Sequence, residues 1–203
     1  PVLVSIPADD WLATTEPVAP HRVSQHLRPE PMLLGALGDA LDACARPAFV
    51  IGSAVDRDGA WHEAVALAER HGARVFVAPM SGRCGFPEDH RLFAGFLPAM
   101  RERIVAKLAG HDLVFALGAP AFTYHVEGQG PHVPEGAALV QLIDDPATAA
   151  WTPQGLSVIG SIRLGLQDLL ARPAPKPRAL PAPRSETATA AWRAPSPTCR
   201  LHD

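Results

Sequence analysis

Short apolar runs alternate with segments of helical period between residues 32 and 170, and this alternation constrains the fold more than any other feature of the chain. The runs are almost continuously apolar, which is typical of strands buried on both faces of a parallel sheet. Helices between the runs would cover those faces. Five to six strands are expected, and the five that can be assigned are 47–52, 74–78, 112–117, 138–143 and 156–159.

Helical segments fill the intervals, over residues 31–45, 61–71, 98–109 and 161–171. In the second of them Trp61 and Val65 share one face and Glu69 lies on the other. Gly72 follows directly, and glycine is the residue type that closes a helix in the left-handed conformation. The order of elements predicts an α/β fold: a Rossmann-like, doubly wound parallel sheet with helices on both faces and functional sites at the carboxyl ends of the strands.

Residues 79–97 depart from this rhythm. They carry Met80, Cys84, Phe86, Phe93 and Phe96 among several glycines and prolines, without a steady period. Long loops in compact domains are often lids or contact surfaces, and an apolar loop suits packing against a neighbouring domain. A loop that covers its own core is the alternative, and the sequence leaves both open.

Composition limits the classes of function. The chain is 47% hydrophobic and 19% charged with a formal net charge of -3, so it lacks the basic excess that would neutralise nucleic acid phosphates. Its apolar runs fall short of the roughly 18 residues that a membrane-spanning helix needs, and no signal segment opens the chain. We therefore expect a cytoplasmic protein with neither nucleic acid nor membrane as a partner.

No familiar motif assembles a complete site within the chain. Cys44, Cys84 and Cys199 are far apart and form no CxxC pair, so they suggest buried or unreactive thiols, not a disulfide framework or a zinc site. The sequences GxSxG, HExxH and the P-loop are absent. The chain brings together neither a nucleophile with its base nor a metal site, and no metal-binding residue is predicted.

Both ends predict that the chain is an excerpt of a longer protein. It opens without methionine on an apolar stretch, residues 1–7, which is typical of the last strand of a preceding unit, and Asp9 to Trp11 are expected to form the exit of that strand. Residues 172–197 are crowded with proline and alanine, which is typical of an extended linker.

The first predicted crossover, residues 52–59, is where a dinucleotide-binding domain would carry GxGxxG, and that pattern is missing. Asp56 and Asp58 would also repel a pyrophosphate. We expect instead a helix start with Asp56 or Asp58 near the positive end of the helix dipole. A flavin or nicotinamide nucleotide is therefore a poor candidate ligand.

His125 is the one candidate catalytic residue. It lies in residues 118–125, a loop at the carboxyl end of a predicted core strand, where doubly wound folds place their sites. Imidazole can donate or accept a proton near neutral pH. For the other histidines we expect surface or capping positions; among them are His21, His26, His71, His90, His111 and His132.

Several local sequences resemble one family, in order and at similar spacing. They include Val-Ser-Ile-Pro-Ala-Asp-Asp-Trp at 4–11, where that family has tyrosine in place of Ala8, and Arg-Cys-Gly-Phe-Pro at 83–87. Gly-His-Asp at 110–112 and the segment 118–125 continue the match. Over residues 1–170 the chain resembles the middle domain of benzoylformate decarboxylases, which are thiamine diphosphate-dependent enzymes.

The resemblance implies a division of the chain. Residues 1–12 would end a pyrimidine-binding domain, 13–30 would be a linker, 31–171 the central domain, and 172–203 a linker toward a diphosphate-binding domain. In the parent enzyme, thiamine diphosphate and Mg²⁺ or Ca²⁺ would be held by the two other domains, so no cofactor-binding residue is predicted here. The parent is expected to be a homo-oligomer, a dimer or tetramer.

The resemblance also implies an activity: nonoxidative decarboxylation of a 2-oxo acid, benzoylformate to benzaldehyde and carbon dioxide. His125 matches a family histidine that reaches into the active site for proton transfer to the reacting carbon or for acid–base steps around product release. Phe122 and Tyr124 match as well, but packing explains them equally. The isolated chain is expected to be inactive. Two alternatives remain: a module that binds FAD or ADP, and a related thiamine diphosphate lyase with another substrate.

Overall fold

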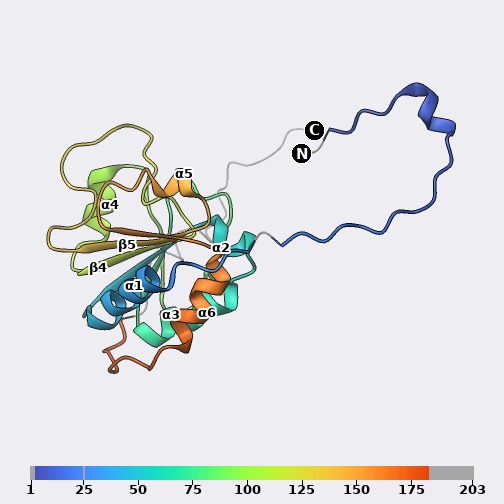
Figure 1. The fold of residues 1–203 in the computed structure, drawn as a ribbon. Coiled ribbons are helices and arrows are strands. Elements are labelled where there is room, and N and C mark those ends of the chain that lie inside the picture. The colour runs from blue at the N-terminus through green and yellow to red at the C-terminus, as the bar shows by residue number, and fades with distance from the viewer. Residues whose placement is uncertain (1–2, 25, 183–203) are drawn as a thin grey trace, which may run out of the picture.

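The computed structural model describes residues 3–24 and 26–182, and its described strands form one parallel sheet in the order β3-β2-β1-β4-β5-β6 (Figure 1). This confirms the predicted Rossmann-like sheet of five to six strands. The strands are β1 (Pro47–Ile51), β2 (Arg74–Val77), β3 (Phe93–Phe96), β4 (Leu113–Leu117), β5 (Ala138–Ile143) and β6 (Leu156–Ile159).

Helices cover both faces, as predicted. In Figure 1 α1, α3 and α6 lie below the sheet, and α4 and α5 lie above it. No helix in the described part of the chain is long and apolar enough to cross a membrane. The helices are η1 (Ala8–Leu12, a 3-10 helix), α1 (Pro31–Ala43), α2 (Ser53–Arg57), α3 (Trp61–His71), α4 (Arg101–Lys107), α5 (Pro146–Ala149) and α6 (Ile162–Ala171).

Alternate residues of the central strands enter two separate cores. All five residues of β1 are buried; Phe49 and Ile51 join the core under α1, α3 and α6, while Ala48 and Val50 join the core on the opposite face. Phe49 meets Phe115 of β4 edge to face, with 5.1 Å between ring centroids. Burial on both faces is why these strands are continuously apolar.

The two cores are covered by different kinds of structure. Three helices of ten or more residues cover the first. On the second face α4 supplies Ile104, and Leu108 follows directly as its C-cap. The irregular segment between β4 and β5 supplies Ala119, Ala121 and Val133. We call this segment, residues 118–137, the β4–β5 loop. It forms part of a structural layer and is not a free connection.

β3 is the strand that could not be assigned from the sequence, because it lies within the irregular segment 79–97. It is a four-residue edge strand, and its pairing with β2 shifts register where Gly95 adopts φ 100°. Phe86, Leu92 and Phe93 in this segment are buried in the first core. The segment therefore covers its own core, while Met80 and Phe96 remain exposed.

Gly72 ends α3 in the left-handed conformation, with φ 60°, which confirms its predicted role. The expected acidic residue near a helix start at the first crossover is confirmed for Asp56. The helix after β1 begins at Ser53, with Gly52 as its N-cap, so Asp56 lies in the first turn of α2, near the positive end of the helix dipole, whereas Asp58 follows the helix as its C-cap. Asp58 instead accepts hydrogen bonds from Ser161 Oγ and the Arg163 amide, both 2.7 Å, and thus caps α6.

The expected N-terminal strand is absent from the described residues. Residues 3–7 are extended without pairing, and Ala8–Leu12 form a 3-10 helix where a strand exit was expected. Residues 3–24 are exposed and project away from the domain (Figure 1). The chain joins the domain near Leu27, whose carbonyl accepts from the Ser161 amide at 2.7 Å.

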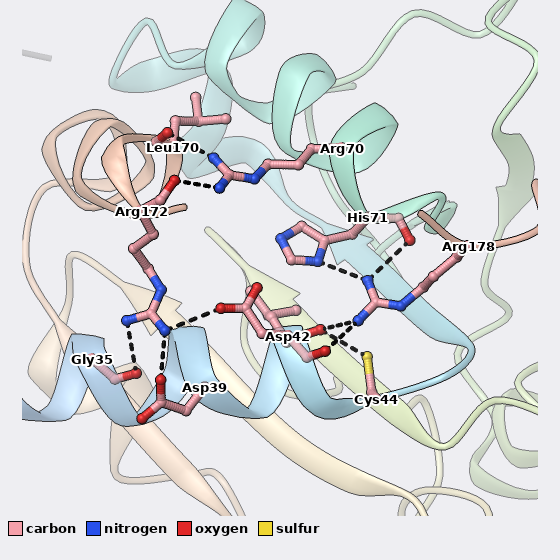
Figure 2. Close-up of polar contacts among 10 residues, drawn as sticks. Gly35, Asp39, Asp42, Cys44, Arg70, His71, Leu170, Arg172 and Arg178 are labelled. Carbon is pink, nitrogen blue, oxygen red and sulfur yellow. Dashed lines mark hydrogen bonds and ion pairs between the residues drawn. The ribbon is translucent and has the colours of Figure 1, made fainter. Parts of the chain in front are cut away.

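Residues 172–182, here called the C-terminal strap, are irregular but lie against α1 and α3, as Figure 2 shows. Arg172 pairs with Asp39 and with Asp42, the latter at 3.0 Å. It lies so close to α1 that a β-carbon at Gly38 would be 2.6 Å from its Nε. The sequence predicted an extended linker here but not its docking. The rest of that predicted linker, 183–203, lies outside the described residues.

Arg178 joins the C-terminal ends of two helices (Figure 2). Its guanidinium donates to the carbonyls of Leu41 and Asp42 on α1, at 2.6 and 2.9 Å, and to the carbonyl of His71 on α3 at 3.3 Å. A cation at these positions donates to carbonyls that have no partner within their helices. It also interacts favourably with the negative ends of both helix dipoles.

His71 is the last residue of α3, which confirms the expected position at a helix end, but it is only 3% exposed and therefore does not lie on the surface. Its Nδ1 lies 2.9 Å from Arg178 Nη1 and must act as the acceptor, because arginine only donates. Burial and the neighbouring Arg178 lower the pKa of His71 to about 4. The imidazole is therefore neutral when the strap is docked.

The free energy of unfolding should decrease as pH falls from about 6.5 to about 4. Over this range the unfolded chain takes up a proton at His71 and the folded chain does not, so the loss reaches roughly 3 kcal/mol. Chemical denaturation of the 203-residue chain at several pH values measures it. His71→Asn should flatten the slope, whereas His62→Asn, on the exposed side of the same helix, should leave it unchanged.

Candidate functional site

β4 ends at a tight turn. Gly118 follows Leu117 with φ 63°, a conformation that favours glycine, and its amide donates to the Leu142 carbonyl of β5 at 2.9 Å. The turn also comes very close to the end of β1, since a β-carbon at Gly52 would lie 2.5 Å from the Gly118 carbonyl oxygen. Both glycines are therefore required for the two strand ends to meet.

This close approach fills the crevice between β1 and β4, where the strand order reverses and where a Rossmann domain would bind a pyrophosphate. The Ala54 amide at the start of α2 donates to the Gly118 carbonyl at 3.0 Å. An amide that a nucleotide phosphate would need is thus already bonded within the protein.

A hollow of about 310 Å³ remains beside this contact, at the carboxyl ends of β1, β2 and β4. Its lining is Gly52, Ser53, Ala78, Pro79, Met80, Ser81, Gly82, Ala119, Pro120 and Thr123. None of these side chains carries a positive charge. The hollow therefore does not fit a diphosphate group, whether of thiamine diphosphate or of a flavin nucleotide.

A larger hollow of about 720 Å³ lies near the carboxyl ends of β5 and β6. Within its lining Arg57 pairs with Asp144 at 2.6 Å, and His26 lies 3.0 Å from Asp58. Two further lining residues have partners outside it: Arg28 pairs with Asp168, and Glu30 accepts from the amides of Met32 and Leu33. No group of three or more His, Cys, Asp or Glu side chains among residues 3–24 and 26–182 is arranged to hold a metal ion.

His125 lies eight residues beyond β4, in the β4–β5 loop, and its side chain is exposed. Its backbone is fixed, because the His125 amide donates to the Ala99 carbonyl at 3.0 Å, just before α4. The structure thus places the predicted catalytic residue on the expected carboxyl side of the sheet, with an accessible imidazole. The arrangement allows proton exchange with a molecule that approaches this edge.

Tyr124, directly before His125, points into the domain. Its hydroxyl lies 2.8 Å from Nδ1 of His132, and the ring packs against the second core. Burial raises the pKa of Tyr124, and burial together with Arg101 lowers the pKa of His132. Both shifts favour a neutral phenol that donates to a neutral imidazole. Tyr124 and Phe122 are thus packing residues in this structure.

The first turn of α4 binds the part of the β4–β5 loop that follows His125. Arg101 forms an ion pair with Glu127 and donates to the Gly130 carbonyl at 3.1 Å. Glu102 accepts from the Gln129 amide at 2.8 Å, and this hydrogen bond holds the pKa of Glu102 below its usual range. Residues on both sides of His125 are therefore tied to the same helix end.

Gln141 anchors the start of the β4–β5 loop from inside the sheet. It is fully buried in β5, and its Nε2 donates to the Ala119 carbonyl at 2.9 Å. Its Oε1 accepts from Thr152 and Ser157 hydroxyls at 2.7 and 2.8 Å. Both acceptor positions of Oε1 and one of the two Nε2 hydrogens are thus used. A buried amide is costly without such partners.

Sequence reasoning missed Arg101, Glu102, His132 and Gln141. For Arg101 the sequence did contain an indication. Arg101 begins a helix, where the positive end of the helix dipole disfavours a cation, so an arginine there needs other partners. Gln141 likewise interrupts an apolar strand. Neither pattern names the partner, because all the contacts come from distant residues.

The two cysteines in the described part of the chain are unreactive thiols, as expected. Burial raises the pKa of Cys44 to about 11, and its Sγ donates to the Leu41 carbonyl at 3.2 Å. Burial also raises the pKa of Cys84, whose Sγ donates to the Phe86 carbonyl at 3.0 Å. Neither is activated as a nucleophile. Cys199 lies outside the described residues.

Comparison with known proteins gives consistent matches. Residues 34–169 match the family described as thiamine pyrophosphate enzyme, central domain. Benzoylformate decarboxylase from Pseudomonas aeruginosa is 44% identical over 185 residues, which are 89% of this chain and 35% of that protein.

Two solved structures share the fold. Benzoylformate decarboxylase from Polynucleobacter necessarius has a TM-score of 0.79 and 32% identity, over 87% of this chain and 34% of that one. Thiamine diphosphate-dependent 4-hydroxybenzoylformate decarboxylase from Rhodococcus jostii RHA1 has a TM-score of 0.74 and 35% identity, over 86% and 34%. The chain thus spans about a third of the length of these relatives.

The chain belongs to the family of thiamine pyrophosphate enzyme central domains. Within that family it is related to the corresponding part of benzoylformate decarboxylase. The resemblance recognised in its local sequences is therefore confirmed.

The tight packing between the ends of β1 and β4 can be tested by substituting two glycines that have the same φ angle. Gly118→Ala should destabilise the chain by about 3 kcal/mol, because φ 63° strains the new residue and its β-carbon would lie 2.8 Å from the Val55 amide. Gly59→Ala, also at φ 63° but with no atom within 4 Å, should cost only about 1 kcal/mol. Equal losses in chemical denaturation would contradict the packing argument.

Proposed function

We propose that this chain is the middle domain of a thiamine diphosphate-dependent 2-oxo acid decarboxylase and that it supplies His125 to the active site of that enzyme. The observation that carries the proposal is the placement of His125: an exposed imidazole whose loop is secured on both sides at the carboxyl edge of the sheet. An imidazole so held can meet a substrate from outside this domain and exchange a proton with it.

The proposal includes the organisation of the whole enzyme. Residues 1–12 would end a pyrimidine-binding domain, 13–30 would link it to this one, and 172–203 would lead to a diphosphate-binding domain. Those two domains would hold thiamine diphosphate with Mg²⁺ or Ca²⁺, and the whole would assemble as a dimer or tetramer in the cytoplasm. The poor fit of the hollow near β1 and β4 to a diphosphate supports a cofactor site elsewhere.

We assign the substrate by class. The relatives are named for benzoylformate and 4-hydroxybenzoylformate, which are 2-oxo acids that carry an aryl ring. An aryl 2-oxo acid, with benzoylformate as the first choice, is therefore the proposed substrate. A lyase of the same kind with another 2-oxo acid is the alternative, and within this chain the loop around His125 is the part that could bias the choice.

Replacing the imidazole tests the role of His125. In the full-length enzyme His125→Ala should lower kcat by about 100-fold and change the shape of the pH profile of kcat/KM, because a side chain that can donate or accept a proton has been removed. Affinity for thiamine diphosphate should stay the same. Steady-state kinetics with benzoylformate across pH and a cofactor titration measure these effects.

His62→Ala is the matched control, since His62 is equally exposed but lies on α3, on the opposite side of the sheet. Its rates should equal those of the wild type. Wild-type rates across the pH range for His125→Ala would remove His125 from the mechanism. A large loss of cofactor affinity would point instead to a binding role.

The main alternative, a module that binds FAD or ADP, has a direct test. The Gly52–Gly118 contact and the bonded Ala54 amide oppose such binding. Calorimetry with FAD and with ADP should therefore detect no binding to the 203-residue chain at millimolar concentrations. Saturable binding of either nucleotide with one site per chain would favour the alternative.

A further inference from the structure

The β4–β5 loop is fastened to the N-terminal end of α4 on both sides of His125. Before His125, the ring of Tyr124 lies under the guanidinium of Arg101, with 5.2 Å from Cζ to the ring centroid. After His125, Glu127 forms an ion pair with the same guanidinium. A single side chain thus contacts the residue directly before His125 and the second residue after it.

The burial of Arg101 makes this arrangement unusual. Its side chain is only 10% exposed, whereas that of Glu127 is 76% exposed. A buried guanidinium is costly unless its donors are satisfied. Here Glu127 and the Gly130 carbonyl, the latter at 3.1 Å, are partners of the two terminal nitrogens, and the face of Tyr124 lies against the group, while the buried Nε has no hydrogen-bond partner in the described part of the chain. All three belong to the β4–β5 loop. The charge at the start of α4 is therefore stabilised by contacts with that loop.

We infer that Arg101 is a positioning residue for His125: it fixes the imidazole by holding Tyr124 on one side and Glu127 on the other. The inference rests on the proposed function, because it gives a role to Arg101 only if His125 takes part in the reaction. Arg101 itself is too deeply buried to meet a substrate. It acts through the loop.

The position of His125 matters because proton transfer requires a short distance between the imidazole and the reacting group. A general acid or base has to lie within hydrogen-bonding distance of the reacting group, and a displacement of about 1 Å can cost about 100-fold in rate. One backbone hydrogen bond, from the His125 amide to Ala99, cannot by itself fix the side chain of an exposed loop residue. The Arg101 contacts supply the second and third points of attachment.

Arg101→Met in the full-length enzyme is the primary test, since methionine fills much of the buried space but makes none of the polar contacts. We expect kcat to fall about tenfold with KM nearly unchanged, because the imidazole is misplaced for the chemical step while the substrate site lies elsewhere. Arg101→Lys keeps the charge but loses the planar fork, so it should recover part of the loss.

Two further variants guard against a loss caused by misfolding. Glu127→Gln removes the ion pair from the exposed side without touching a buried residue, so it should lower kcat in the same direction but less. Arg103→Met, on the exposed side of the same helix, is the matched control and should retain wild-type kcat. Thermal unfolding of each variant shows whether the fold is intact.

A double-mutant cycle separates positioning from a general structural role. If Arg101 acts through His125, Arg101→Met should lower kcat no further in a His125→Ala background than His125→Ala does alone. Multiplicative losses would show that Arg101 acts independently of His125 and would overturn the inference. Wild-type kcat in both Arg101→Met and Glu127→Gln would overturn it as well.

The same set of variants distinguishes a failure of this inference from a failure of the proposed function. If His125→Ala has wild-type rates, the proposed function fails, and the inference about Arg101 falls with it. If His125→Ala is slow while Arg101→Met is normal, the proposed function stands and only the positioning role is rejected.

Discussion

A parallel sheet has two apolar faces, and the chain has to cover both. Here the coverage is unequal: α1, α3 and α6 lie on one face, while the other has only the seven residues of α4 and the four of α5. The β4–β5 loop makes up the difference by burying Ala119, Ala121 and Val133. Because the sheet needs this loop as a cover, the loop has a defined position, and His125 is fixed in space as a consequence.

The sequence predicted the central strands well because burial on both faces leaves a continuous apolar run. It missed β3, an edge strand of four residues that includes Gly95, and α2, which is too short to show a period. The location of His125 and its candidacy as a catalytic residue followed from its place after a strand, and the family resemblance then added a specific proposed role. The contacts of Arg101 join residues about 23 to 29 positions apart, and no local pattern encodes such pairs.

Several helix ends and turns of this domain are capped by residues that are distant in the sequence. Asp58 follows α2 directly but caps α6, about a hundred residues away. Asp112 accepts from the amides of Ala45 and Arg46, both at 2.7 Å, and so fixes the turn before β1. Arg178 closes α1 and α3 together. Rules that consider only neighbouring residues cannot find partners that the tertiary fold brings together.

The docked strap also determines at which edge of the sheet the described chain leaves the domain. Leu27 enters beside Ser161 at the carboxyl edge of the sheet, but Ala182 accepts from Arg74 at the beginning of β2, on the amino edge. Any sequence after the strap therefore starts about 17 Å from the edge that bears His125, the length of a five-residue strand. The entering segment and His125 thus share one edge of the sheet, while the end of the strap lies at the other.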